Sequence, residues 1–283
     1  MSLARGRTLV DGQVRDQVSV LDRGLSYGDG LFETVRFVGS QAPLWARHMQ
    51  RLETSCLRLG LPAPDPTTLL CEAREVTAGW SQAVARITIT RGTGTRGYAP
   101  PNAPSATRIV AGFEPPVLRA EEAIEGLRVR RCTLRLAEQP ALAGMKHLNR
   151  LEQVLARAEW LDPSIAEGLL GDWHGRVISA TAANLFAVLD DTLVTPALER
   201  CGIAGVARAE ILAAAPQAQV RDIGWDELAR ASEVFLCSSV RGILPVRAMD
   251  ARPYTIGPIT RTMQRHWRGL GFLDQAFPME QAG

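Results

Sequence analysis

Lys146 is the one lysine in a chain of 283 residues, in which lysine and arginine together number 32. Arginine keeps its proton in proteins. A lysine amine that is desolvated or close to other cations can lose its proton and attack a carbonyl to form a Schiff base. A sequence that uses arginine elsewhere and keeps lysine once therefore predicts a chemical role for Lys146. The alternative is a lysine that survives by chance on the surface.

Two further stretches could bind an anion. Residues 202–208 (GIAGVAR) open a predicted helix, whose free N–H groups and positive dipole end suit a phosphate, and Ser239 could add a hydroxyl donor after a predicted strand. The loop 91–98 (RGTGTRGY) could bring guanidinium groups to a carboxylate, although a solvated loop is the simpler interpretation. Neither this loop nor residues 28–30 fit a P-loop or a dinucleotide fingerprint. A reactive lysine and a phosphate site together are what a pyridoxal phosphate enzyme needs.

The elements that must position these residues mix strands and helices. Apolar spacing predicts strands, helices and hairpins over the following ranges: strands 31–38, 83–90, 107–113, 127–133 and 234–237; helices 46–59, 148–160, 205–215 and 259–270, with another after Pro66; and hairpins around residues 11–12, 174–175 and 190–191. Consecutive prolines at 115–116 predict a linker. We expect an α+β protein with domains at residues 1–114 and 123–283, joined by a linker at 115–122, rather than a doubly wound parallel sheet.

Composition narrows the function classes. With 46% hydrophobic and 22% charged residues, the chain predicts a sizeable core. A net charge of +2 without a basic run argues against nucleic-acid binding, and no apolar run is long enough to cross a membrane. The N-terminus lacks the apolar core of a signal peptide. Five scattered cysteines without a Cys-x-x-Cys pair predict reduced thiols in a cytoplasmic protein and no structural zinc or other metal site.

Four segments resemble, in order, the signatures of the class IV aminotransferases, which are the fold-type IV pyridoxal phosphate enzymes. They are residues 22–34 (DRGLSYGDGLFET), 146–152 (KHLNRLE), 183–186 (ANLF) and 244–246 (LPV). The resemblance runs from about Leu9 to about Arg247. Within the family, residues 91–98 and the sequence around Lys146 are most similar to the aminodeoxychorismate lyases, whereas branched-chain aminotransferases usually carry tyrosine in place of Arg150.

The resemblance implies a fold of the D-amino acid aminotransferase type, with pyridoxal 5'-phosphate as the cofactor. It also implies a role for each matching residue: Lys146 as the Schiff-base lysine, Arg51 as the phosphate-binding arginine, Val206 and Ala207 as amides that cap the phosphate, Ser239 as a hydroxyl that completes this site, Arg96 and Tyr98 as a loop that reaches a substrate carboxylate, and Thr34 as a catalytic threonine near the reacting face.

One position departs from the family pattern. The family usually carries glutamate five residues before the asparagine of the ANLF segment, where it keeps the pyridine nitrogen protonated. Here the residue is Ser179, which can hydrogen-bond that nitrogen but supplies no negative charge. The expected electron sink is therefore weaker, which favours a lyase over an aminotransferase.

The activity that the resemblance implies is the conversion of 4-amino-4-deoxychorismate to 4-aminobenzoate and pyruvate, on the way to folate. It also implies a homodimer and a functional link to the synthase that supplies the substrate. Two alternatives stay open from the sequence. One is a branched-chain or D-amino acid aminotransferase of the same fold, and the other is a cofactor-binding protein with little catalysis.

Overall fold

The computed structural model describes residues 7–272, which form two compact units. The first unit runs to Pro116 and also includes Met145–Asn149, while the second comprises Val117–Gly144 and the chain from Arg150 onward. The chain therefore leaves the second unit for five residues and then returns to it. Those five residues include Lys146, so the lysine belongs to the first unit.

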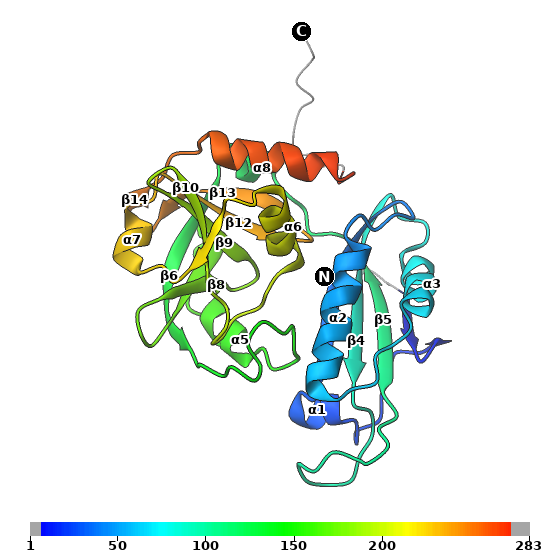
Figure 1. Cartoon of the computed structure of the whole chain (residues 1–283). Coiled ribbons are helices and arrows are strands. Elements are labelled where there is room, and N and C mark those ends of the chain that lie inside the picture. The colour runs from blue at the N-terminus through cyan, green and yellow to red at the C-terminus, as the bar shows by residue number, and fades with distance from the viewer. Residues whose placement is uncertain (1–6, 273–283) are drawn as a thin grey trace. The chain divides into compact units, whose positions relative to one another are not determined.

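The first unit is a five-stranded antiparallel sheet with two longer helices, α2 and α3, against it (Figure 1). The strand order is β2-β1-β5-β4-β3. Its elements are β1 (Thr8–Val10), β2 (Gln13–Val14), α1 (Arg23–Tyr27), β3 (Gly30–Val38), α2 (Trp45–Leu59), α3 (Pro66–Thr77), β4 (Gln82–Thr90) and β5 (Thr107–Phe113).

The two faces of this sheet differ because successive side chains of a strand point to opposite sides. Leu31, Val35 and Phe37 of β3 are almost fully buried on the face that α2 and α3 cover. On the same face, Glu72 of α3 forms two hydrogen bonds with Arg108 of β5, both 2.7 Å long. The alternate positions of β3 therefore face away from the two helices.

The second unit is built on a nine-stranded mixed sheet, in the order β11-β10-β9-β12-β13-β6-β7-β8, with β14 paired to β13. The helix α8 packs on β13 and β12, as Figure 1 shows in orange and red. The elements are α4 (Ala120–Ile124), β6 (Leu127–Leu136), α5 (Leu151–Arg157), β7 (Glu167–Asp172), β8 (Val177–Ala180), β9 (Asn184–Leu189), β10 (Thr192–Pro196), α6 (Val206–Ala214), β11 (Gln219–Arg221), α7 (Trp225–Ala229), β12 (Glu233–Ser238), β13 (Gly242–Met249), β14 (Arg252–Pro253) and α8 (Pro258–Gly269).

The predicted α+β class is confirmed, and so are the helices at 46–59 and 205–215 and the strands at 31–38, 83–90 and 107–113, to within one or two residues. The helix predicted from Leu148 was wrong at both ends, because α5 covers only Leu151–Arg157. Residues 146–148 are instead extended and pair with a strand. All five cysteines are free thiols, and Cys71 is the exposed one. Among residues 7–272, no helix is long and apolar enough to span a membrane.

Candidate active site

Lys146 lies in an extended segment that pairs with the free edge of β3. The N–H of Phe32 donates to the carbonyl of Lys146 at 2.9 Å, and the N–H of Leu148 donates to the carbonyl of Gly30 at 3.0 Å. This antiparallel register sets Lys146 opposite Phe32, and the Lys146 Nζ lies 4.2 Å from the centre of the Phe32 ring. Thr34 is two residues further along β3, so Lys146, Phe32 and Thr34 share the sheet face turned away from α2 and α3.

The glycines of residues 28–30 make room for this segment. A Cβ on Gly28 would come within 2.4 Å of the Asn149 amide oxygen, and a Cβ on Gly30 would come within 2.4 Å of the Ile89 carbonyl oxygen of β4 and within 2.9 Å of the Leu148 side chain. Gly28 also has a φ of +66°, which disfavours other residue types, and its carbonyl accepts a hydrogen bond from Asn149 at 3.3 Å. The glycine pattern in the sequence is therefore explained by the close approach of the lysine segment at Gly28, and of both this segment and β4 at Gly30.

A buried carboxylate, that of Glu33, lies on the opposite face of β3, which α2 covers. Glu33 of β3 accepts hydrogen bonds from the Arg51 Nε at 2.8 Å and the Arg51 Nη2 at 2.5 Å. The His48 Nδ1 lies 2.6 Å from the second Glu33 oxygen. Both Glu33 and His48 have side chains that are only 1% exposed. Arg51 and His48 are one helical turn apart on α2, so both reach the same carboxylate.

The pKa values of Glu33 and His48 depend on each other and on the charge of Arg51. Burial alone would raise the pKa of Glu33, but Arg51 and His48 outweigh it and lower the pKa to about 2. Burial lowers the pKa of His48, and the hydrogen bond and charge of Glu33 oppose this only in part. The positive charges of Arg51 and Lys146 lower it further. At neutral pH Glu33 is therefore ionised, and a neutral His48 donates its Nδ1–H to that carboxylate.

Arg96 and Tyr98 lie in the loop between β4 and β5. Arg23 holds this loop by donating to the carbonyls of Gly97 at 2.9 Å and Tyr98 at 3.0 Å. The Tyr98 ring meets the Tyr27 ring edge-on at 5.6 Å, yet Tyr98 is 87% exposed. Arg91, in contrast, is structural, since it donates to Asp29 and to the carbonyls of Leu59 and Gly60 at the end of α2.

In the second unit, Asn184 shapes the loop that leads into α6. Its amide oxygen accepts from the N–H of Gly205 at 3.0 Å, and its amide nitrogen donates to the carbonyl of Ile203 at 2.9 Å. A Cβ on Gly205 would lie 2.0 Å from the Asn184 oxygen, so glycine is required there. No side chain caps the start of α6, at Val206 and Ala207. An uncapped helix start of this kind fits a phosphate group.

Ser239 belongs to the turn between β12 and β13. Asn184 is the direct cross-strand neighbour of Cys237, two residues before Ser239. The turn is closed by the Arg241 N–H, which donates to the Ser238 hydroxyl at 3.1 Å. Through Asn184, the start of α6 and the Ser239 turn are therefore held at the same end of the β9–β12 strand pair.

The loop before α6 is also tied to the segment that leads to the lysine. The N–H of Gly144 donates to the carbonyl of Gly202 at 2.9 Å, and the N–H of Ala204 donates to the carbonyl of Gly144 at 3.0 Å. Lys146 follows this anchored glycine by two residues along the chain.

Ser179 lies on β8, opposite Leu170 of β7, and is buried at 8% exposure.

The sequence profile described as Amino-transferase class IV matches residues 30–249. The chain belongs to this family. The match covers Lys146, Arg51, Asn184 and Ser239, and it leaves out residues 1–29 and 250–283, where β1, β2, α1, β14 and α8 lie.

Among curated relatives of this chain, the aminodeoxychorismate lyase of Vibrio harveyi is 35% identical over 263 residues, which cover 90% of this chain and 97% of the relative. The crystal structure of 4-amino-4-deoxychorismate lyase from Pseudomonas aeruginosa is 48% identical, covers 95% of this chain and 100% of that chain, and superposes with a TM-score of 0.89. A branched-chain amino acid aminotransferase solved with pyridoxamine 5'-phosphate is 26% identical, with 93% of each chain covered and a TM-score of 0.79.

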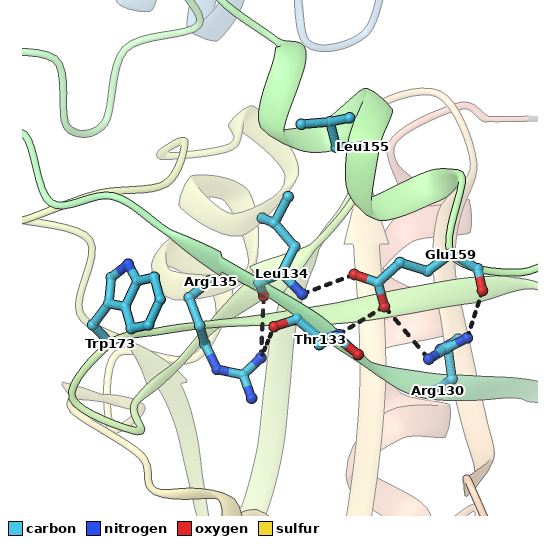
Figure 2. A pocket seen from close by; sticks show the side chains of 7 residues that line it. All are labelled: Arg130, Thr133, Leu134, Arg135, Leu155, Glu159 and Trp173. Atoms are coloured by element: carbon cyan, nitrogen blue, oxygen red, sulfur yellow. Dashed lines mark hydrogen bonds and ion pairs between the residues drawn. The ribbon is translucent and has the colours of Figure 1, made fainter.

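A hollow of about 570 Å³ lies elsewhere on the second unit, and none of the site residues predicted from the sequence lines it. Figure 2 shows Leu155, Leu134 and Trp173 around it, with Glu159 paired to Arg130. Its lining residues are Arg130, Thr133, Leu134, Arg135, Leu155, Glu159 and Trp173.

Sequence reasoning missed Glu33, His48 and Asn184 as residues that position the site. Glu33 carried a usable signal, because it is the one carboxylate of β3 and alternates in phase with the apolar residues Leu31 and Val35. Asn184 was present in a quoted family segment, but its amide contacts with residues 203–205 require the folded loop. His48 had no independent signal beyond its spacing from Arg51.

Glu33→Gln should loosen Arg51 and weaken cofactor retention on dialysis. Removing one partner of a buried ion pair costs about 3–5 kcal/mol, so the free energy of unfolding should also fall. Glu72→Gln is the matched control, because Glu72 also pairs with an arginine of this unit through two hydrogen bonds. We expect the control to lose stability but to retain cofactor, and equal retention by both variants would contradict the role of Glu33.

The Glu33→Gln variant also gives a pH test. The pKa of Glu33 is about 2 in the folded protein, below its ordinary value of 4.5. Its stabilisation is therefore fully present above pH 4.5 and is lost as the pH falls toward 2. Denaturant unfolding of Glu33→Gln should show a weaker loss of stability across this window than the wild-type protein shows.

Proposed function

We propose that this protein is a pyridoxal phosphate-dependent lyase that converts 4-amino-4-deoxychorismate to 4-aminobenzoate and pyruvate. The observation that carries the proposal is the position of the single lysine, held opposite Phe32 and on the same sheet face as Thr34. The two aminodeoxychorismate lyases at 35% and 48% identity support it over nearly the full chain.

The proposed cofactor ligands are Lys146, Arg51, Ser179, Val206, Ala207 and Ser239. Their chemistry fits pyridoxal 5'-phosphate, since they offer an amine, a guanidinium, an uncapped helix start and hydroxyl groups. The pyridoxamine 5'-phosphate in the aminotransferase structure at 26% identity supports a cofactor of this type. When bound, this cofactor supplies an electron sink for the substrate amine carbon.

The chain's own residues would then move protons and hold the substrate. Lys146 acts as the general base that removes the proton from the amine-bearing ring carbon. The Thr34 hydroxyl, on the same sheet face, passes a proton to the departing enolpyruvyl oxygen. Arg96 and Tyr98 bind a substrate carboxylate, to which the exposure of their loop gives them access. Ser179 hydrogen-bonds the ring nitrogen without adding a negative charge.

An aminotransferase of the same family is the second candidate, because the relative solved with pyridoxamine 5'-phosphate is named as one. Ser179 argues against it, since a weaker electron sink favours a reaction that aromatisation drives forward. We propose in addition that the protein acts in the cytoplasm, with a functional link to the synthase that supplies 4-amino-4-deoxychorismate.

We also propose that two copies form a homodimer through α5. Three apolar residues of this short helix are open to solvent, Leu151 at 68%, Val154 at 60% and Leu155 at 55% exposure. The hollow beside them has Trp173, at 77% exposure, on its border (Figure 2). An apolar patch of this kind on an enzyme is typical of a surface that a partner covers.

Lys146→Arg should abolish 4-aminobenzoate formation, because a guanidinium keeps its proton and cannot act as base or amine nucleophile. The assay couples the protein to the synthase with chorismate and glutamine, and the visible absorbance of bound cofactor should vanish with the activity. We expect turnover to fall by a factor of at least about 100. Arg74→Lys on α3 is the control and should keep both signals. Amino transfer to 2-oxoglutarate by the wild type, without 4-aminobenzoate, would establish the second candidate.

Leu155→Glu should shift the protein from dimer to monomer in light scattering coupled to size-exclusion chromatography, because a charge replaces apolar contact area. Val220→Glu, a comparable change on the exposed strand β11, should leave the dimer intact. A monomeric wild-type protein, or a Leu155→Glu protein that remains dimeric like the control, would rule out this face as the interface.

A further inference from the structure

One arginine of the second unit is buried without an acidic partner. Arg208 lies in the first turn of α6 and is 9% exposed. Its Nε donates to the Thr195 hydroxyl at 3.2 Å, and its Nη2 donates to the Pro196 carbonyl at 3.0 Å. Both acceptors are neutral, so these hydrogen bonds orient the guanidinium but leave its charge uncompensated. Burial lowers the pKa of Arg208, yet an arginine keeps its proton in a protein.

The buried carboxylates of this unit are engaged elsewhere. Residues 117–272 bury four carboxylates, and each of them contacts donors other than Arg208. These contacts are Glu167 with Arg241 and Thr181, Asp172 with Arg176, Glu210 with His266, and Glu233 with the N–H groups of Ile259 and Thr260. Glu210 lies on α6 itself, but it reaches α8 through His266. Within residues 7–272, therefore, no carboxylate pairs with Arg208.

A buried charge without a counter-charge is unfavourable, because burial removes it from water and nothing replaces the lost solvation. Arg23 and Arg91 of the first unit are buried to a similar degree, and both of them pair with Asp29. Arg208 differs from them in this respect. An anion that binds near Arg208 would supply the counter-charge that the chain does not.

The start of α6 offers donors for such an anion. The N–H groups of Val206, Ala207 and Arg208 have no acceptor within residues 7–272, since the bond from Ala209 to Gly205 is the first of the helix. The positive end of the helix dipole lies at the same place. An anion bound there would meet backbone donors and, from the same helical turn, a buried cation.

The charge of Arg208 also acts on the end of β12. Burial raises the pKa of the Cys237 thiol to about 12, and the positive charge of Arg208 opposes this rise. Cys237 precedes Ser239 by two residues and is the cross-strand neighbour of Asn184, which holds the loop before α6. Arg208 therefore lies close to both parts of the second unit that are proposed to bind the cofactor phosphate.

We propose that Arg208 is the buried counter-charge of the cofactor phosphate and keeps that phosphate doubly ionised. This inference rests on the proposed cofactor and deepens it, because Val206, Ala207 and Ser239 offer only neutral donors. A phosphate monoester loses its second proton at a pH of about 6 in water, and a nearby cation favours the doubly charged form. Arg208 is a positioning residue in this role. The second unit thereby selects a phosphorylated ligand over its unphosphorylated counterpart.

The affinity for a phosphorylated ligand relative to an unphosphorylated one tests the proposal. The dissociation constants of pyridoxal 5'-phosphate and of pyridoxal are measured for the full-length protein by absorbance titration. We expect Arg208→Met to weaken the binding of pyridoxal 5'-phosphate roughly 10- to 100-fold and that of pyridoxal less than about threefold, because an attraction between two charges is lost. A variant with wild-type affinity for both ligands, or one that loses affinity for both equally, would overturn the proposal.

Two further variants separate charge from shape. Arg208→Lys keeps a cation in the first turn of α6, so its preference for the phosphorylated ligand should lie closer to the wild type than to Arg208→Met. Thr195→Val removes one hydrogen bond that orients the guanidinium but leaves its charge, so the preference should stay within roughly threefold of the wild-type value. If either variant loses the preference as fully as Arg208→Met does, the role of Arg208 is one of shape and the proposal fails.

Inorganic phosphate separates this inference from the lyase assignment, because its binding requires neither turnover nor a Schiff base. We expect phosphate to raise the thermal midpoint of the cofactor-free wild type above that in chloride of equal ionic strength, since an anion that binds the folded protein stabilises it. The rise should be smaller in Arg208→Met. A wild type that gains nothing from phosphate, or a variant that gains as much, would overturn the role of Arg208. The expected rises in a protein that forms no 4-aminobenzoate would support Arg208 and count against the lyase assignment alone.

Discussion

The arrangement of the candidate site depends on one strand edge. Residues 146–148 form two backbone hydrogen bonds with the outer edge of β3, although the residues on either side of 145–149 belong to the second unit. This pairing fixes the direction of the Lys146 side chain, because alternation along an extended chain leaves it opposite Phe32. It also accounts for Gly28, where a side chain would meet Asn149, and together with the close approach of Ile89 in β4 it accounts for Gly30.

Strand alternation then separates two electrostatic environments across β3. On the helix side, Glu33 is saturated by Arg51 and His48, so the negative charge of the strand is neutralised inside the core. On the other side, Lys146 and Arg86 share one aromatic ring without a carboxylate on that face of the strands. A one-residue shift of β3 would turn Glu33 away from Arg51 and His48 and toward the face of Lys146 and Arg86, so the register of the sheet and the chemistry of the site depend on each other.

Many of the helices and strands could be predicted from residue patterns. Periodicity gave α2 and the strands β3, β4 and β5 nearly to the residue, because each buries one regular face. The helix predicted from Leu148 failed because its first residues satisfy their backbone groups on β3, a long-range pairing with no local signal. The strand order of the mixed nine-stranded sheet could not be predicted either, because β6 pairs in parallel with both β13 and β7, which are distant from it or separated from it by a helix in the sequence. The residue types at the site were visible in the sequence. The ion pair of Glu33 with Arg51 and the hydrogen bonds of Asn184 to Ile203 and Gly205 could be identified only from the folded structure.

We propose that the edge-bound Lys146 is the amine that carries pyridoxal 5'-phosphate. Borohydride reduction of the reconstituted protein, followed by peptide mass mapping, tests it directly, because Lys146 is the chain's single lysine and the N-terminal amine is the one competing site. We expect a stable cofactor adduct on the peptide that contains Lys146. An adduct at the N-terminal amine alone, or no adduct on a protein that retains bound cofactor, would contradict it.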